Sequence, residues 1–365
     1  MKLKNIIIFF PNFAKGGIEK TSMLLSNFFI KKGLKIKFIT FDKINFKRYN
    51  FSKNIEFYYY KRKKKYLFFR NIYCMYVLFK ILIKNNNKDT AVFSLQNSVL
   101  SIIISKILNF KIIVRNSAPI DYFRGEKVLY NKFKLFIKMR IYYFSDLVIS
   151  NSKSSAYKIR INLDKKIEVI AISNPITNLN NKIYKKKRKN KILYVGRLSK
   201  EKGIFELIEG FELFNKDFPR FKLDLVGDGH QRKNLSKFIR DRNLSGQIKI
   251  IKWTNNINKY YKKSKMIILP SLFEGFGNVL IEALNFNLPC VATKNNGPKD
   301  ILANGRYGFL MKDNRANTIN LSLRHVEKNY NLYKFKAIKG LKNNHQYHIN
   351  IIGKKYFSKI SSVLR

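Results

Sequence analysis

The sequence is poor in cysteine and tryptophan, with two Cys and one Trp among 365 residues. The cysteines, Cys74 and Cys290, lie far apart in the chain, which argues against a disulfide framework. Neither belongs to a Cys/His spacing typical of a metal site, so no metal ligands are expected. A chain of this kind suits a reducing, cytosolic compartment.

Long hydrophobic runs are also lacking. The apolar run at residues 6–10 stops at Pro11, too early for the apolar region of a signal peptide, and is better interpreted as a buried strand. The longest uncharged stretch, residues 90–105, contains Ser, Gln and Asn and is too short and polar to cross a bilayer. We therefore expect neither a signal peptide nor a transmembrane helix.

Acidic residues are scarce: 22 Asp and Glu face 74 Lys and Arg, which gives a formal net charge of +52. Such a charge attracts polyanions, namely nucleic acid, anionic lipid or phosphorylated small molecules, although many lysines can equally be solvated surface residues. A nucleic-acid-binding protein is one alternative, but no helix-turn-helix or aromatic RNA-binding motif is found. With 45% hydrophobic residues, the chain is expected to fold around real cores.

Short runs rich in Ile, Val and Phe alternate with segments of helical period. This alternation predicts an α/β fold of parallel sheets covered on both faces. In the first half a helix is expected at 18–32, closed by Gly33, and strands are expected at 5–10, 34–40, 91–94, 111–114, 146–150 and 168–172. In the second half helices are expected from 203, at 230–242 and at 278–286, with strands at 191–195, 221–226, 247–251, 266–270 and 289–293.

A polar and strongly basic stretch at residues 177–190 separates the two halves and is the best linker candidate. We therefore expect a Rossmann-like domain at 1–176, a second one at 191–344, and a C-terminal helix at 345–365 that packs back on the first domain. Ligands of such sheets bind beyond the carboxyl ends of the strands. A cleft between the two domains is the expected site.

Three segments that follow predicted strands carry candidate chemistry. Gly16 and Gly17 open the first helix, where a close backbone approach and free N–H groups suit an anion, and Glu19 follows in the first turn. Arg197 and Lys202 follow the strand at 191–195, where two cations can hold a diphosphate. An ordinary turn and two solvated cations are the competing interpretations.

The third segment, PSLFEGFGNVLIEAL at 270–284, places Glu274 on a turn and Glu282 inside a helix. On one helix the two would stand about 80° apart around the axis and about 12 Å apart along it. With Glu274 on the turn, the two carboxylates can grip separate hydroxyl-rich parts of one ligand, while amides near Gly277 and Asn278 face phosphate. A surface Glu and a helix-face Glu remain the alternative.

Taken in order, the segments GGIE, GRLSKEKG, VGDG, PSLFEGFGNVLIEAL and GPKDIL resemble the retaining GT-B glycosyltransferases of family 4, the glycosyl transferases group 1. The resemblance is strongest over residues 191–310, and GPKDIL is similar to the branch that builds bacterial surface polysaccharides and glycan precursors. It implies two doubly wound Rossmann-like domains facing across a cleft. It also implies a sugar transfer from a nucleotide-diphosphate donor, UDP-linked by expectation, to a saccharide acceptor, with retention of configuration and no metal or cofactor.

The resemblance implies residue roles. Arg197 and Lys202 would bind the donor diphosphate, Glu274 the transferred sugar and Glu282 the ribose, so that the catalytic residues are Glu274, Arg197 and Lys202. The implied donor-binding set is Gly16, Gly17, Arg197, Lys202, Glu274, Gly277, Asn278, Val279 and Glu282. Two further readings keep this fold: a nucleotide-sugar epimerase or phosphorylase, and an inactive scaffold.

The chain departs from the family pattern at two places. Where many relatives carry a His after the fourth strand of the first domain, this chain has Arg115 and Asn116, which with Glu19 are the acceptor-side candidates. After the strand at 247–251, Lys252 and Trp253 replace a frequent Gly, which affects recognition of the base. His230, after VGDG, is expected to be a helix-start residue.

Two basic, aromatic-rich stretches point to a membrane surface. Residues 61–65 are all cationic and lead into an aromatic segment at 66–80, and residues 127–144 repeat the pattern. Such segments suit the interface of an anionic bilayer, and packing of their aromatic residues in the core is the alternative. We expect a cytoplasmic protein, peripheral on the inner face of the plasma membrane, with a lipid-linked acceptor and no nucleic-acid partner.

Overall fold

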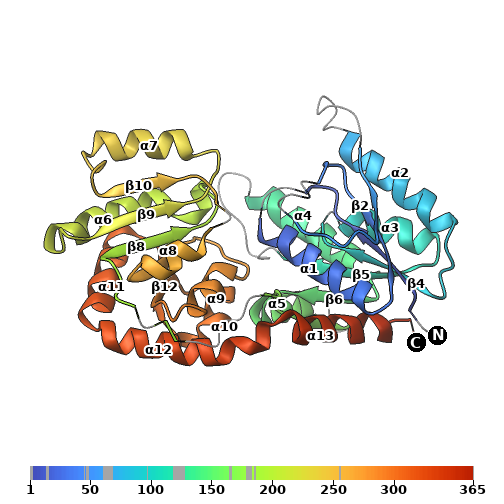
Figure 1. Ribbon diagram of the computed structural model, residues 1–365. Helices are drawn as coiled ribbons and strands as arrows, with labels where there is room; N and C mark the ends of the chain where they lie inside the picture. The colour runs from blue at the N-terminus through green and yellow to red at the C-terminus, as the bar shows by residue number, and fades with distance from the viewer. Residues whose placement is uncertain are drawn as a thin grey trace. The chain divides into compact units, whose positions relative to one another are not determined.

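The computed structural model describes residues 3–13, 16–44, 46, 49–60, 69–96, 98–117, 128–163, 167–177, 183–184, 186–254 and 256–364. The chain forms two compact units. Unit 1 comprises Met1–Thr177 and Tyr347–Arg365, and unit 2 comprises Asn178–Gln346. Each unit is an α/β layered structure, shown in Figure 1.

Unit 1 is built on a parallel sheet of seven strands in the order β3-β2-β1-β4-β5-β6-β7. The central strands are apolar on both faces, as a sheet covered on both sides requires. The strand expected at 5–10 is β1, and Ile55–Tyr58, which the sequence analysis missed, is an edge strand. The strands are β1 (Asn5–Phe9), β2 (Lys35–Ile39), β3 (Ile55–Tyr58), β4 (Thr90–Ser94), β5 (Lys111–Asn116), β6 (Leu147–Ser150) and β7 (Val169–Ala171).

Helices cover both faces of this sheet. Its alternating side chains enter two cores: Ile8 belongs to the core shared with α1 and α13, and Phe9 belongs to the core shared with α2, α3, α4 and α5. The first helix ends with Lys32 as its C-cap rather than Gly33, which follows at φ 80°. The helices are α1 (Gly17–Lys31), α2 (Arg70–Ile83), α3 (Ser98–Ile107), α4 (Val128–Tyr142), α5 (Lys153–Asn162) and α13 (Ile349–Ser362).

Unit 2 contains a second parallel sheet, of six strands, in the order β10-β9-β8-β11-β12-β13. The strand β8 has β9 on one side and β11 on the other, so the loops after these three strands meet at one edge. This edge is where an open α/β sheet binds ligands. The strands are β8 (Lys191–Val195), β9 (Lys222–Val226), β10 (Ile248–Ile251), β11 (Met266–Leu269), β12 (Cys290–Thr293) and β13 (Phe309–Met311).

The helices of unit 2 include several that the sequence analysis did not predict. The helix expected at 230–242 begins only at Arg232, so His230 is an exposed loop residue that precedes it. The helices are α6 (Ile204–Asp217), α7 (Arg232–Asp241), α8 (Asn258–Lys263), α9 (Asn278–Leu284), α10 (Asn296–Ile301), α11 (Ala316–Lys328) and α12 (Tyr330–Asn343), with short 3-10 turns η2 (Lys200–Lys202), η3 (Ala303–Gly305) and η4 (Asn344–Tyr347).

Part of the stretch expected as a linker is attached to unit 2. The guanidinium of Arg188 donates to the backbone carbonyls of Tyr261 at 2.7 Å and Ser264 at 2.9 Å, and also to that of Phe286. The backbone N–H of Tyr184 donates to Asn287 Oδ1 at 2.7 Å. Arg188 thus satisfies carbonyls at the ends of α8 and α9, and its burial lowers the pKa of the guanidinium.

In the described part of the chain, no helix has both the length and the apolarity that crossing a bilayer requires. The cationic residues 61–65 lie outside the described residues.

Candidate functional site

The loops after β8 and β9 are held together by glycines. A Cβ on Gly227 would lie 1.8 Å from the carbonyl oxygen of Gly196, and one on Gly229 would lie 2.3 Å from that of Leu198. The Leu198 N–H donates to the Asp228 carbonyl at 3.0 Å. The two glycines of VGDG therefore allow the β9 loop to pack closely on GRLSKEKG, because a side chain at either Gly227 or Gly229 would separate the two backbones.

The loop after β8 is also joined to the loop after β11. Gly203 has φ 65°, and a Cβ there would lie 2.2 Å from the Pro270 carbonyl oxygen. The Leu272 N–H donates to the Glu201 carbonyl at 3.0 Å. Two segments far apart in sequence, 200–203 and 270–274, are thereby fixed side by side.

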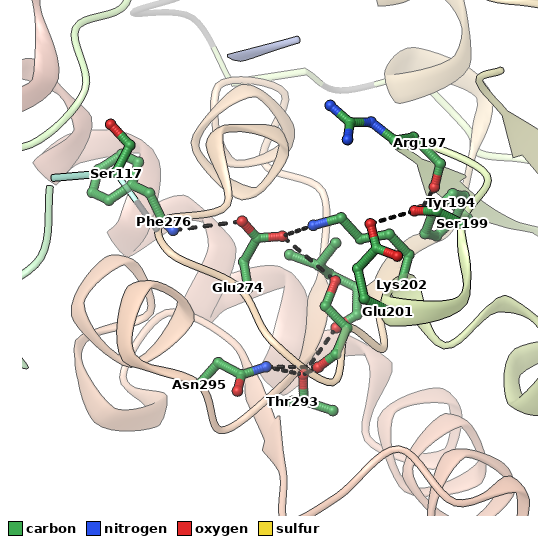
Figure 2. A network of polar contacts seen from close by, with 12 residues as sticks. Ser117, Tyr194, Arg197, Ser199, Glu201, Lys202, Glu274, Phe276, Thr293 and Asn295 are labelled. Atoms are coloured by element: carbon green, nitrogen blue, oxygen red, sulfur yellow. Dashed lines mark hydrogen bonds and ion pairs between the residues drawn. The ribbon is translucent and has the colours of Figure 1, made fainter. Parts of the chain in front are cut away.

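This packing brings Lys202 and Glu274 together. Lys202 Nζ lies 2.8 Å from Glu274 Oε2, and both side chains are largely buried, at 21% and 16% exposure. Figure 2 shows the Lys202 and Glu274 side chains facing one another. The Ser271 hydroxyl lies 3.4 Å from the same carboxylate oxygen, Oε2. An ammonium carries three donors, so Lys202 can hold Glu274 and a phosphate oxygen at once.

The turn that carries Glu274 is held in place by contacts with the loop after β12. The Ser271 carbonyl accepts hydrogen bonds from Thr293 Oγ1 and Asn295 Nδ2, each at 2.6 Å. A Cβ on Gly297 would lie 2.2 Å from Phe276 Cα. The glycine of GPKDIL therefore allows α10 to pack closely against the turn after β11.

Arg197 is the exposed member of the site. In Figure 2 its side chain and that of Lys202 both extend from the β8 loop toward the side on which Glu274 lies. Burial alone would raise the pKa of Glu201, but the Ser199 hydroxyl at 2.6 Å and the nearby Lys202 and Arg197 hold it below its usual value. The two cations therefore act on the same small region.

The backbone after β11 turns sharply into α9. Gly277, at φ 93°, is the N-cap of this helix, and Asn278 and Val279 follow it, both half-buried. Glycine adopts this left-handed backbone conformation without strain. That the amides at Gly277, Asn278 and Val279 meet phosphate stays a prediction.

Glu282 is held by a tyrosine that the sequence analysis missed. The fully buried Tyr261 donates its hydroxyl to Glu282 Oε2 at 2.9 Å, and its ring stacks on Phe286 with centroids 5.6 Å apart. Burial and the Glu282 carboxylate raise the pKa of this phenol well above its usual value. Tyr261 is therefore a neutral donor that fixes the direction of one Glu282 oxygen.

Replacing Tyr261 with phenylalanine is expected to weaken UDP binding about 3–10-fold, because the ring packing stays while one hydrogen bond that orients Glu282 is lost. Titration calorimetry with UDP measures the effect. Tyr260→Phe, at the neighbouring half-buried position, is the matched control and is expected to bind as the wild type does. Equal affinities for all three proteins would show that Glu282 needs no such support.

Unit 1 places its candidate residues at the carboxyl ends of β1 and β5. Gly16 is the N-cap of α1 and provides no side-chain cap, and Gly17 is its first residue. Glu19 lies in the first turn and is buried, at 4% exposure. Whether Gly16 and Gly17 bind the donor, and Glu19 the acceptor, stays a prediction.

Arg115 lies inside unit 1 rather than on its surface, at 1% exposure. Its Nε donates to the Tyr356 hydroxyl at 2.9 Å, and its other nitrogens donate to Ser117 Oγ and Asn174 Oδ1. These contacts join the end of β5 to α13. The acceptor role of Arg115 stays a prediction, and its observed contacts are those of an internal tie.

The neighbouring candidate, Asn116, is also buried, at 3% exposure. Its side-chain oxygen accepts a hydrogen bond from Lys138 Nζ at 3.1 Å. The end of β5 is thereby linked to α4 as well as to α13.

Replacing Tyr356 with phenylalanine is expected to lower the free energy of unfolding by about 1–3 kcal/mol, because a buried guanidinium N–H loses its acceptor. Calorimetric unfolding of the full chain measures this. Tyr157→Phe removes a hydroxyl from a side chain that is 63% exposed on α5 of the same unit, and is expected to leave stability unchanged. Equal stability of both variants would contradict the tie between Arg115 and α13.

The described residues hold no cluster of three or more His, Cys, Asp or Glu side chains suited to a metal ion. After β10, Lys252 and Trp253 are both exposed, Trp253 at 45%. They follow β10, which pairs with β9 at the sheet edge, and therefore lie beside the loop after β9.

Residues 176–337 match the family model described as "Glycosyl transferases group 1". This part of the chain belongs to that family. It contains β8 to β13 and therefore both Lys202 and Glu274.

The curated relatives that the chain matches over part of its length are named as glycosyltransferases. The chain is 28% identical over 235 residues to an uncharacterised glycosyltransferase of Methanocaldococcus jannaschii, covering 57% of each chain. It is 30% identical over 197 residues to N-acetylgalactosamine-N,N'-diacetylbacillosaminyl-diphospho-undecaprenol 4-alpha-N-acetylgalactosaminyltransferase of Campylobacter jejuni, covering 52% of each. The chain thus spans about half the length of the curated relatives it matches.

Solved structures show the same fold over the whole chain. The Anabaena HepE structure in complex with UDP and glucose has a TM-score of 0.79 at 16% identity, covering 99% of this chain and 100% of that one. Sucrose-phosphate synthase from Thermosynechococcus elongatus has a TM-score of 0.82 at 16% identity, covering 99% of each. With the two parallel α/β sheets, this confirms the predicted GT-B fold class.

Proposed function

We propose that this chain is a glycosyltransferase that moves a sugar from a nucleotide-diphosphate donor, UDP-linked, to a saccharide acceptor. The ion pair of Lys202 with Glu274, where the β8 and β11 loops meet, carries the proposal. A cation that holds a diphosphate and a carboxylate that holds sugar hydroxyls are here within 2.8 Å of one another. Exposed Arg197 adds a second cation on the same β8 loop.

In the proposed reaction an acceptor hydroxyl oxygen forms a bond to the anomeric carbon of the donor sugar. The bond from that carbon to the diphosphate oxygen breaks, and the departing phosphate takes the proton of the acceptor hydroxyl. Negative charge grows on the diphosphate as the bond breaks. Lys202 and Arg197 therefore stabilise the transition state more than they stabilise the bound donor. Glu274 accepts hydrogen bonds from the sugar and Glu282 from the ribose.

A thermal-shift screen with UDP, GDP and ADP sugars tests donor binding. We expect a UDP sugar to raise the unfolding temperature of the wild type, because a ligand bound only by the folded state stabilises it. Glu282→Ala is expected to show a smaller rise. A chain that responds to no nucleotide sugar, or a variant that responds as the wild type does, would contradict the donor site.

Retention and independence of metal belong to the same proposal and rest on the family resemblance. Both are tested in one transfer assay, by the anomeric configuration of the product and by activity in the presence of a chelator. An epimerised donor, or a sugar phosphate as product, would instead show an epimerase or a phosphorylase on the same fold.

The proposal further places the chain in the cytoplasm, on the inner face of the plasma membrane, with a lipid-linked, diphosphate-linked acceptor. The name of the Campylobacter jejuni relative, which contains diphospho-undecaprenol, supports this choice. Transfer to a saccharide on a polyprenyl diphosphate should exceed transfer to the same free saccharide. Equal rates would argue for a soluble acceptor.

A further inference from the structure

The outer face of α2 carries a hydrophobic stripe. Its members follow one another at intervals of four, three and four residues, which places them on one side of the helix. The opposite side, with Cys74 and Leu78, is buried in the core of unit 1. The exposed members are Ile72 at 57%, Tyr76 at 54%, Phe79 at 43% and Ile83 at 60%.

A second stripe lies on α4 and on the residues that follow it. Phe133, Phe136, Ile137 and Phe144 are 63%, 56%, 41% and 60% exposed. Between these helices runs α3, which packs against both (Figure 1) and exposes Ile107 at 70%. A helix layer on a water-soluble domain normally turns polar side chains outward, so exposed apolar side chains on three neighbouring helices indicate a binding surface.

The charged side chains of these three helices all have one sign. The sequences of α2, α3 and α4 contain no Asp or Glu and seven cations, two on α2, one on α3 and four on α4. The cation of α3, Lys106, is neutralised by Asp146 at 2.6 Å. On α2 and α4, Lys80 lies 4.5 Å from the ring centroid of Tyr76, and Arg140 lies 5.2 Å from that of Phe136.

The exposed apolar side chains and the positive charge together indicate which partner binds this surface. A second copy of the chain, bound by the same face, would bring two sets of cations together. A nucleic acid would pair with the cations but leave the Phe and Ile side chains in water. An anionic bilayer satisfies both, since apolar side chains enter the headgroup boundary while Lys and Arg extend to lipid phosphates.

We propose that the outer face of α2, α3 and α4 binds the surface of an anionic lipid bilayer. The inference deepens the membrane position given in the proposed function, but it rests on unit 1 alone. It therefore holds or fails in a binding experiment that needs neither donor nor acceptor.

Flotation of the full chain with lipid vesicles tests the surface. Vesicles of phosphatidylcholine with about one-third phosphatidylglycerol should carry the wild type, and pure phosphatidylcholine should carry much less. Raising the salt from about 0.15 M to about 0.5 M should weaken the binding. Phe133→Ser with Phe136→Ser should lower the partition coefficient about tenfold or more.

The matched control lies in unit 2. Leu332→Ser with Phe335→Ser alters α12 side chains that are 48% and 54% exposed and should leave partition unchanged. Equal loss in both double variants, or no flotation of the wild type on anionic vesicles, would overturn the proposal. So would a dimer of the wild type that the α4 variant dissociates. The donor proposal is tested separately: if UDP still raises the unfolding temperature of the α4 variant, the donor site is intact whatever the flotation result.

Discussion

Replacing Lys202 with alanine is expected to lower kcat/KM for sugar transfer about 10²–10³-fold. The substitution removes the cation that lies 2.8 Å from Glu274 and that would meet the departing diphosphate. Much of the loss should appear in kcat, because charge on the diphosphate is greatest in the transition state. Initial rates with varied UDP sugar measure the effect.

Lys200→Ala is the matched control, since Lys200 lies in the same 3-10 turn and is exposed. Its kcat/KM should stay near that of the wild type. Fluorescence of Trp253, the single tryptophan of the chain, reports whether unit 2 of each variant remains folded. A loss shared by both variants, or a fully active folded Lys202→Ala, would contradict the assigned role.

Replacing Gly203 with alanine is expected to lower the stability of unit 2 by about 2–4 kcal/mol. Two costs add: the residue has φ 65°, and the new Cβ would lie 2.2 Å from the Pro270 carbonyl oxygen. Because relief of the clash would separate the β8 loop from the β11 loop, UDP binding should weaken as well. Denaturant unfolding followed by Trp253 fluorescence measures stability within unit 2.

Gly246→Ala provides the control for this change. Apart from Gly246 and its two chain neighbours, no described residue has an atom within 4 Å of a Cβ at Gly246, and the φ of Gly246 is not in the left-handed region. Its stability should stay within about 0.5 kcal/mol of the wild type. If Gly203→Ala were as stable as Gly246→Ala, the close packing of the two loops would not be what shapes the site.

The strands that the sequence predicted well are those whose side chains are buried on both faces. Residues 191–195 were expected as a strand and form β8 with the same bounds. A short apolar run with β-branched and aromatic residues is typical of a buried strand. The edge strands β3 and β13 were missed. They are only four and three residues long and partly exposed, so they leave little pattern.

The contacts of the site could not be predicted from spacing alone. Lys202 and Glu274 are 72 positions apart, and they meet because β8 and β11 are neighbours in the sheet. The family resemblance supplied their roles, but not the glycine contacts that hold their loops together. Tyr261 was missed because a tyrosine in a basic segment, YYKK, shows no sign of its contact with Glu282.

Arg115 shows a second limit of sequence reasoning. Arg115 was named as an acceptor-side candidate, and that role stays a prediction. Its hydrogen bond to Tyr356, 241 positions later, could not be predicted. Nothing near Arg115 in sequence marks that contact, because α13 returns to unit 1 only after the whole of unit 2.

Titration calorimetry with UDP and UMP, on the wild type and on Lys202→Ala, tests most directly the claim that the β8 loop holds a diphosphate. The wild type should bind UDP about 10–100-fold more tightly than UMP, because the second phosphate gains charge-assisted hydrogen bonds. In Lys202→Ala that preference should largely vanish while UMP binding changes little. An equal preference for UDP in both proteins, or no binding of either nucleotide, would contradict the account.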